Sequence, residues 1–136
     1  MRATSKRGKR AVLLLRASVN AEDRTTLITQ ESEAREFAAK EGIEIVAMFV
    51  DDGKSGYKPG THRPGHDAAM AYIQRKQADI LLVWKLDRMV RNLMGFAEEW
   101  NIINRAGGEF VSVVESWADT TTPQGRLMLM IVAAFA

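Results

Sequence analysis

The sequence predicts an α/β domain of three layers, in which helices cover both faces of a mainly parallel sheet of four to five strands. Four short apolar runs alternate with helix-like segments along the chain. Two of these runs, 11–15 and 79–86, are almost continuously hydrophobic, which is typical of parallel strands buried on both faces. At 136 residues the chain is long enough for one domain that buries about two-thirds of its unfolded surface.

The N-terminal half contains two expected strands and two expected helices. The runs 11–15 and 43–50 are the strands. The helix expected over 25–42 has apolar residues near one face and ends at Gly42, a common helix stop. A second helix is expected over 64–77. The residues expected to face the core are Leu27, Ala34, Phe37, Ala38, Ala69, Met70 and Ile73.

The C-terminal half continues the alternation. The runs 79–86 and 109–116 are the third and fourth strands, and the helix between them ends at a pair of glycines. Its start is unusual: Asp87 fits an N-cap, whereas Arg88 and Arg91 bring positive charge to a helix end that already repels cations. A bound anion would explain both arginines.

The last segment of the chain is expected to form a helix that begins near Pro123. From Leu127 to Ala136 every residue is apolar, and a helix that is apolar all round must be covered all round. The run is too short to cross a membrane, so one face is expected to pack on its own domain and the other on a partner subunit. Met128 and Met130 are expected to face different sides. The alternative is a terminal helix buried within its own core.

The basic character of the chain comes from its first ten residues. The formal charge is +2, but residues 1–10 hold five of the 19 bases, and without them 14 bases face 17 acids, a charge of −3. We expect 1–10 to be a basic flexible tail, either simply solvated or lying near nucleic acid, and 11–136 to be the domain. The absence of cysteine excludes disulfides and thiolate metal sites and fits a reducing compartment.

Unusual polar residues follow the expected strands. The carboxyl ends of parallel strands share one edge of a sheet, where ligands bind in open α/β folds. Four arginines converging there would repel each other unless a phosphate or carboxylate joined them. The residues in question are Arg16 and Ser18 after the first strand, Ser55 and Arg63 after the second, and Asp87, Arg88 and Arg91 after the third.

Each of these residues also has a simpler interpretation. Ser18 alone is more often a turn residue than a nucleophile, and a single arginine is more often a surface charge. His62 and His66 are four residues apart but lack a third ligand, so no metal site is expected. The segment Gly53–Ser55 lacks the remaining glycine of a phosphate-binding loop.

Taken together, the ordered motifs resemble the catalytic domain of the serine site-specific recombinases, the resolvase and invertase group. They are R-x-S at 16–18, Q-E-S at 30–32, S-G at 55–56 followed by Arg63, L-D-R-x-x-R at 86–91 and T-P-x-G-R at 122–126. The similarity runs from about Ala11 to Ala136. It implies a resolvase-like fold that ends in a long interface helix, which the end of the chain cuts short.

The resemblance also implies a mechanism. Ser18 matches the nucleophile that forms a 5′-phosphoserine link to DNA, and Arg16, Arg63, Arg88 and Arg91 match the arginines around the scissile phosphate. Asp87 matches the acid of the same motif, and Gln30 a polar residue of the active site, with Ser55 beside them as a phosphate-binding candidate. No metal or other cofactor is expected. The expected partners are DNA and further subunits, as a dimer and a synaptic tetramer, in the cytoplasm of a bacterium or a host of a phage or mobile element.

Two features depart from the family pattern. Leu14 stands where the family usually has a tyrosine, and the segment between Ser18 and Gln30 is longer than in the small resolvases, as in the large serine recombinases. We expect the DNA-binding domain to be absent from this chain. Two alternatives remain at this point: a non-catalytic assembly module of the same fold, and an α/β domain that binds a small phosphorylated ligand.

Overall fold

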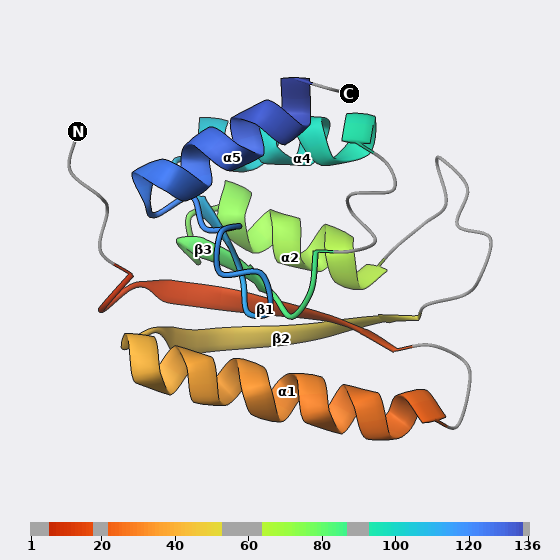
Figure 1. Cartoon of the computed structure of the whole chain (residues 1–136). Coiled ribbons are helices and arrows are strands. Elements are labelled where there is room, and N and C mark those ends of the chain that lie inside the picture. Colours follow the sequence, from red (N-terminus) through yellow and green to blue (C-terminus); the bar gives the residue numbers. More distant parts are fainter. Residues whose placement is uncertain (1–5, 18–21, 53–63, 87–92, 135–136) are drawn as a thin grey trace.

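A computed structural model of the chain describes residues 6–17, 22–52, 64–86 and 93–134. Its four strands form one sheet in the order β2-β1-β3-β4, and all three strand pairs are parallel. Helix α1 covers one face of the sheet, and α2, α4 and α5 lie on the other (Figure 1). The elements are β1 Arg10–Ala17, α1 Glu22–Glu41, β2 Glu44–Asp52, α2 Pro64–Gln74, β3 Ile80–Val83, α4 Leu93–Arg105, β4 Glu109–Ser112 and α5 Pro123–Ala134. The three-layer α/β prediction is confirmed, with four strands.

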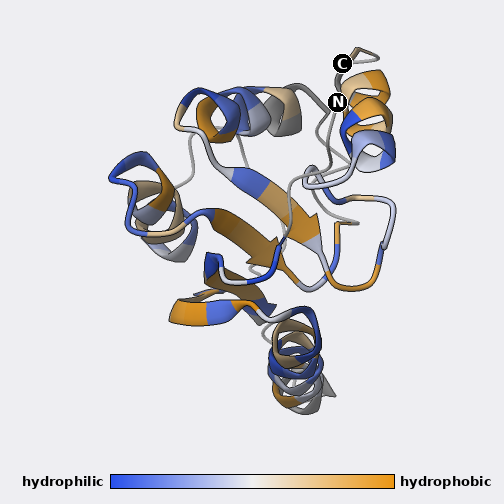
Figure 2. Cartoon of the chain, turned by 90° about the vertical axis from the view of Figure 1, so that its left-hand side faces the viewer, coloured by the Kyte–Doolittle hydropathy of each residue, from blue (hydrophilic) through white to orange (hydrophobic). Residues whose placement is uncertain are grey.

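The core has two parts because successive strand residues point to opposite faces of the sheet. In β1, Val12 faces α2 and its neighbours, whereas Leu13 and Leu15 face α1. Figure 2 shows the largely hydrophobic strands between the helices, of which α5, at the C-terminus, is itself largely hydrophobic. All seven residues expected to face the core belong to these clusters or pack against them: Leu27, Ala34, Phe37, Ala38, Ala69, Met70 and Ile73.

The strand boundaries differ from the prediction at several ends, and β1 and β2 run on to Ala17 and Asp52 rather than ending at 15 and 50. The third strand ends at Val83 rather than at 86, and the fourth ends at Ser112 rather than at 116. The chain turns back between Glu115 and Ala118, so that the backbone N–H of Ser112 donates to the carbonyl oxygen of Ala118 over 2.9 Å. Glu115, which was expected in the strand, therefore lies in a hairpin turn. This hairpin returns beside β4 through the antiparallel bridge between Val111 and Asp119.

Both predicted glycine stops are confirmed. Gly42 and Gly107 have φ angles of 73° and 78°, in the left-handed region that only glycine enters without strain. After α1, the N–H of Ile43 donates to the carbonyl oxygen of Ala38, and after α4 the N–H of Gly108 donates to that of Ile103. These bonds satisfy carbonyl groups that a helix end would otherwise leave unpaired.

Residues 6–10, which belong to the expected tail, lie against the domain, where the N–H of Gly8 donates to the carbonyl oxygen of Gly42. Arg10 is the first residue of β1. The ammonium group of Lys6 lies 2.6 Å from a carboxylate oxygen of Asp119, and both side chains are largely buried. A charge removed from water is costly unless it is paired, and the acid that pairs with Lys6 is distant in sequence.

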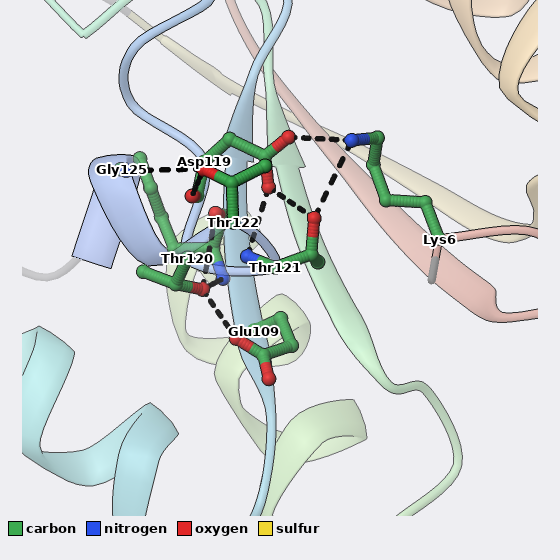
Figure 3. Close-up of polar contacts among 8 residues, drawn as sticks. Lys6, Glu109, Asp119, Thr120, Thr121, Thr122 and Gly125 are labelled. Carbon is green, nitrogen blue, oxygen red and sulfur yellow. Dashed lines mark hydrogen bonds and ion pairs between the residues drawn. The ribbon is translucent and has the colours of Figure 1, made fainter. Parts of the chain in front are cut away.

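Helix α5 begins at a cap that explains the T-P-x-G-R motif (Figure 3). The Thr122 hydroxyl oxygen accepts a hydrogen bond from the N–H of Gly125, as an N-cap does, and Pro123 takes the first helical position. A Cβ on Gly125 would lie 1.9 Å from the carbonyl oxygen of Asp119, so no larger residue fits there. Arg126 lies 3.4 Å from the carboxylate of Glu109. The motif therefore fixes where α5 leaves the sheet.

Along α5 the buried face is narrow. Leu129 is fully buried, whereas Met128 and Met130 are 41% and 53% exposed, and Leu127 and Ile131 are also exposed. The expectation that one of the two methionines faces the core is wrong, because the core contact of this helix runs through Leu129 and Val132, three residues apart. None of the described helices is both long and apolar enough to cross a membrane.

Candidate functional site

The candidate site lies at the carboxyl edge of the sheet, where β1 and β3 are neighbours. From β1 the chain passes through α1 to β2 on one side, while β3 and β4 lie on the other side. Such a reversal of direction between two adjacent strands is where open α/β folds bind ligands. Of the predicted site residues, Arg16 and Gln30 are described, and the others lie outside the described residues: Ser18, Ser55, Arg63, Asp87, Arg88 and Arg91.

The structure brings Arg16 and Gln30 together. Arg16 is the penultimate residue of β1 and pairs in register with Asp51 of β2. Gln30 comes from α1, is 7% exposed, and donates a hydrogen bond from its side-chain amide to the carbonyl oxygen of Arg16 over 3.3 Å. The bond ties the middle of α1 to the end of the strand that leads to Ser18.

Asp51 holds the start of α2, a role that the sequence analysis did not predict. One oxygen of its carboxylate accepts from the N–H of Gly65 over 2.7 Å, and the other accepts from the N–H of His66 over 2.9 Å. A carboxylate at a helix N-terminus satisfies unpaired N–H groups and is favoured by the helix dipole. A Cβ on Gly65 would lie 2.7 Å from the Asp51 oxygen, so glycine permits this approach. Arg63 is two residues before Gly65.

A histidine and a glutamate join α2 to α4. The Nε2 atom of His66 lies 2.6 Å from a carboxylate oxygen of Glu99, and Asp67 lies 3.2 Å from the other ring nitrogen. The two groups form an ion pair when His66 is protonated. The two helices that it joins begin directly after the segments 53–63 and 87–92. In the described part of the chain, no three potential metal ligands come together.

The segment 84–86, which leads to Asp87, is held from two sides. The indole N–H of Trp84 donates to the carboxylate of Glu33 in α1 over 2.7 Å. The backbone N–H of Leu86 donates to the carboxylate of Glu115 in the hairpin after β4 over 3.0 Å. Carboxylates from separate elements thus hold the side chain of Trp84 and the backbone of Leu86, directly before the segment that carries Arg88 and Arg91. Sequence reasoning gave no sign of these contacts, because each joins residues far apart in the chain.

Sequence comparison matches residues 11–136 to the family model described as Resolvase, N terminal domain. The chain is 36% identical over 89 residues to the transposon Tn552 resolvase of Staphylococcus aureus, and 34% identical over 89 residues to the serine recombinase gin of Escherichia phage Mu. Both alignments cover 65% of this chain but 43% and 44% of the two relatives. The chain therefore spans less than half the length of these relatives.

Solved structures give the same fold. The N-terminal catalytic domain of TP901-1 integrase superposes with a TM-score of 0.72 and 26% identity, covering 93% of both chains. A resolvase family site-specific recombinase from Streptococcus pneumoniae superposes with a TM-score of 0.74 and 24% identity, covering 93% of this chain and 85% of that one. The resolvase-like fold expected from the motifs is confirmed.

Proposed function

The chain belongs to the resolvase N-terminal domain family, the catalytic domain of the serine recombinases, and on this basis we propose that it cleaves and rejoins DNA through a serine nucleophile. The observation that carries the proposal is the family match over residues 11–136, with the R-x-S motif beginning at Arg16 in the last two residues of β1. The proposed partner is DNA, and a part outside this domain would supply sequence-specific binding. We call the two together the full recombinase.

In the proposed reaction, the hydroxyl oxygen of Ser18 attacks the scissile phosphorus. A bond from the serine oxygen to phosphorus forms, the bond from phosphorus to the 3′ oxygen breaks, and the serine gives up its proton while the 3′ oxygen leaves as a hydroxyl. The 3′ hydroxyl of another strand then reverses these steps. Because the phosphoserine link replaces one phosphodiester by another, rejoining requires no ATP.

The arginines would supply the electrostatic part of catalysis. Negative charge gathers on the phosphoryl oxygens in the transition state, and fixed guanidinium groups stabilise it without reorganising. We assign this role to Arg16, Arg63, Arg88 and Arg91, with Asp87 and Gln30 positioning them and Ser55 as a further phosphate contact. No metal or cofactor has a role in this mechanism. In the described part of the chain, carboxylates hold the backbone beside the segments that carry these arginines. This supports the proposed role, because arginines act on a phosphate only when they are held in place.

Subunit assembly is the second part of the proposal. Helix α5 exposes Leu127, Met128, Met130 and Ile131, and apolar patches of this kind mark interaction surfaces. We propose that this face packs against α5 or a neighbouring element of a second subunit, in a dimer and then in a synaptic tetramer. The similarity to the TP901-1 integrase domain over nearly the whole chain supports a large serine recombinase.

Covalent trapping tests the proposed reaction. The full recombinase is incubated with its DNA site carrying a nick that lets the cleaved end diffuse away, and the products are separated under denaturing conditions with a chelator present. We expect a protein–DNA complex that survives denaturation and carries the 5′ end of the DNA. A free 5′ phosphate produced only with a divalent metal would contradict the serine mechanism, and binding without cleavage would favour an assembly module.

A further inference from the structure

We propose that Glu115 is a positioning residue for DNA cleavage, which acts by fixing the backbone immediately before the Asp87–Arg91 segment. This inference rests on the proposed recombinase function and adds to it a residue that belongs to none of the catalytic motifs. Glu115 lies in the hairpin between β4 and α5, some 28 residues beyond Asp87 in the chain and in contact with the residue that precedes it.

One carboxylate oxygen of Glu115 makes both contacts. It accepts a hydrogen bond from the N–H of Leu86 over 3.0 Å and another from the hydroxyl of Ser112 over 2.5 Å. Ser112 is the last residue of β4 and is buried, so it holds the carboxylate against the sheet. Hydrogen bonds to an ionised acceptor are stronger than those between neutral groups.

The strand ladder alone does not hold Leu86. Strand β3 ends at Val83, and beyond it the carbonyl oxygens of Val83 and Trp84 accept bonds from Val113 and Val114. The N–H of Leu86 points instead to the Glu115 side chain. The Leu86 side chain is itself buried, in the same core cluster as Leu129 of α5. Because both its backbone N–H and its side chain are held, Leu86 fixes the point from which the chain continues to Asp87.

The same hairpin leads into α5. Its returning arm pairs with β4, where the N–H of Thr120 donates to the carbonyl oxygen of Phe110, and two residues later Thr122 caps the helix. A carboxylate in this hairpin therefore connects the base of the proposed subunit interface to the start of the arginine segment. Misplacing a catalytic group by about 1 Å can cost on the order of 100-fold in rate, so this connection bears directly on cleavage.

Asp79 provides a matched control. Its carboxylate accepts a hydrogen bond from the backbone N–H of Arg10 over 3.0 Å, at the opposite end of β3 from Leu86. Both acids thus bond a backbone N–H beside the same strand, but only Glu115 does so next to the proposed catalytic segment. Asp79→Ala reproduces the loss of such a bond without disturbing that segment.

The experiment measures single-turnover formation of the covalent complex by the full recombinase at saturating DNA. We expect Glu115→Ala to slow the reaction by about tenfold or more while DNA affinity stays within about twofold, and Asp79→Ala to react at the wild-type rate. Glu115→Gln keeps an accepting oxygen at the same reach and should restore most of the rate. Glu115→Asp keeps the charge, but its side chain is one methylene shorter, so this variant should react slowly. It replaces the alanine variant in the test if the alanine variant does not fold.

The outcomes separate the two proposals. If the wild type forms no covalent complex, the recombinase function fails. If the wild type reacts and Glu115→Ala matches Asp79→Ala in rate, Glu115 is a structural residue and its positioning role is wrong. A glutamine variant slower than the aspartate variant would show that charge rather than the hydrogen bond matters, which also overturns the proposal. Hydrogen exchange at the Leu86 N–H should be faster in the alanine variant and protected in the glutamine variant.

Discussion

The side-chain amide of Gln30 donates a hydrogen bond to the backbone carbonyl oxygen of Arg16, with the two atoms 3.3 Å apart. Gln30 is buried under the carboxyl end of β1, in the middle of α1. The bond sets the end of the strand relative to the helix at a point two residues before Ser18. It gives Gln30 a physical role at the site that the family motif alone does not specify.

Replacing Gln30 by leucine should destabilise the domain by about 0.5–1.5 kcal/mol, because the Arg16 carbonyl loses its donor while the volume is kept. Urea unfolding measures this difference. Thr29→Ala, at the exposed neighbouring position, serves as the control and should change stability little. Equal stability of the leucine variant and the wild type would show that the bond contributes nothing to holding the strand end.

Replacing Asp51 by alanine should cost about 0.5–2 kcal/mol, the range for losing a helix N-cap, because two N–H groups of α2 lose their acceptor. Asp51→Asn keeps one accepting oxygen and should cost less. Thermal melts of both variants rank their stabilities, and the exposed substitution Glu36→Ala serves as the control. An asparagine variant less stable than the alanine variant would contradict the capping role.

Asp79 should make the folded state sensitive to acid. Partial burial alone would raise the pKa of this carboxyl, but hydrogen bonds from the backbone and guanidinium of Arg10, with the charges of Arg10 and Lys9, outweigh burial and hold the pKa below 3.8. A carboxyl whose pKa is lower in the folded state binds protons more readily when unfolded, so its stabilisation is present above pH 3.8 and is lost as the pH falls through the folded-state pKa.

The stability difference between wild type and Asp79→Asn should therefore be constant from neutral pH down to about pH 5 and should shrink below 3.8. Urea unfolding across this pH range measures it. A difference that grows as the pH falls would mean that the folded-state pKa is raised instead.

Single substitutions in α5 should distinguish the residues of its buried face, which stabilise the domain, from those of its exposed face. Leu129→Ala should cost about 2–5 kcal/mol because the residue is fully buried. Met128→Lys and Met130→Lys should each change stability by no more than about 0.5 kcal/mol, because both side chains are exposed. In sedimentation of the full recombinase, the two lysine variants should lower the fraction of dimers and tetramers. Unchanged assembly in both would place the subunit interface elsewhere.

The elements and core could be predicted because they depend on local periodicity. The continuous apolar run of β1 and the spacing of Ala34 and Ala38 in α1 are visible in the sequence, and β1 contributes side chains to both halves of the core. The predicted ends of β3 and β4 lie beyond the observed ones, because Glu115 belongs to a turn, where it contacts Leu86, and not to the strand. Apolar character does not distinguish a strand residue from a hairpin residue.

The site was predicted through its motifs, but the residues that hold the motifs were not. Asp51 and Glu115 act by accepting hydrogen bonds from backbone N–H groups 14 and 29 positions away in the chain. Such contacts carry no local pattern, since any acid at the right place in the fold can make them. The orientation of α5 was missed for a related reason: with every residue apolar, the sequence contains no polar face to indicate which side is exposed.

Attachment of DNA to Ser18 is the step on which the proposed activity depends, and mass spectrometry of the trapped complex detects it. The full recombinase is reacted with nicked site DNA, the complex is digested with nuclease and protease, and the peptide that carries a nucleotide 5′-phosphate is identified. We expect the modification on Ser18, and we expect Ser18→Ala to bind DNA as the wild type does but to form no adduct. An adduct that persists in the alanine variant, or one found on Ser55 in the wild type, would contradict the assignment of Ser18 as the nucleophile.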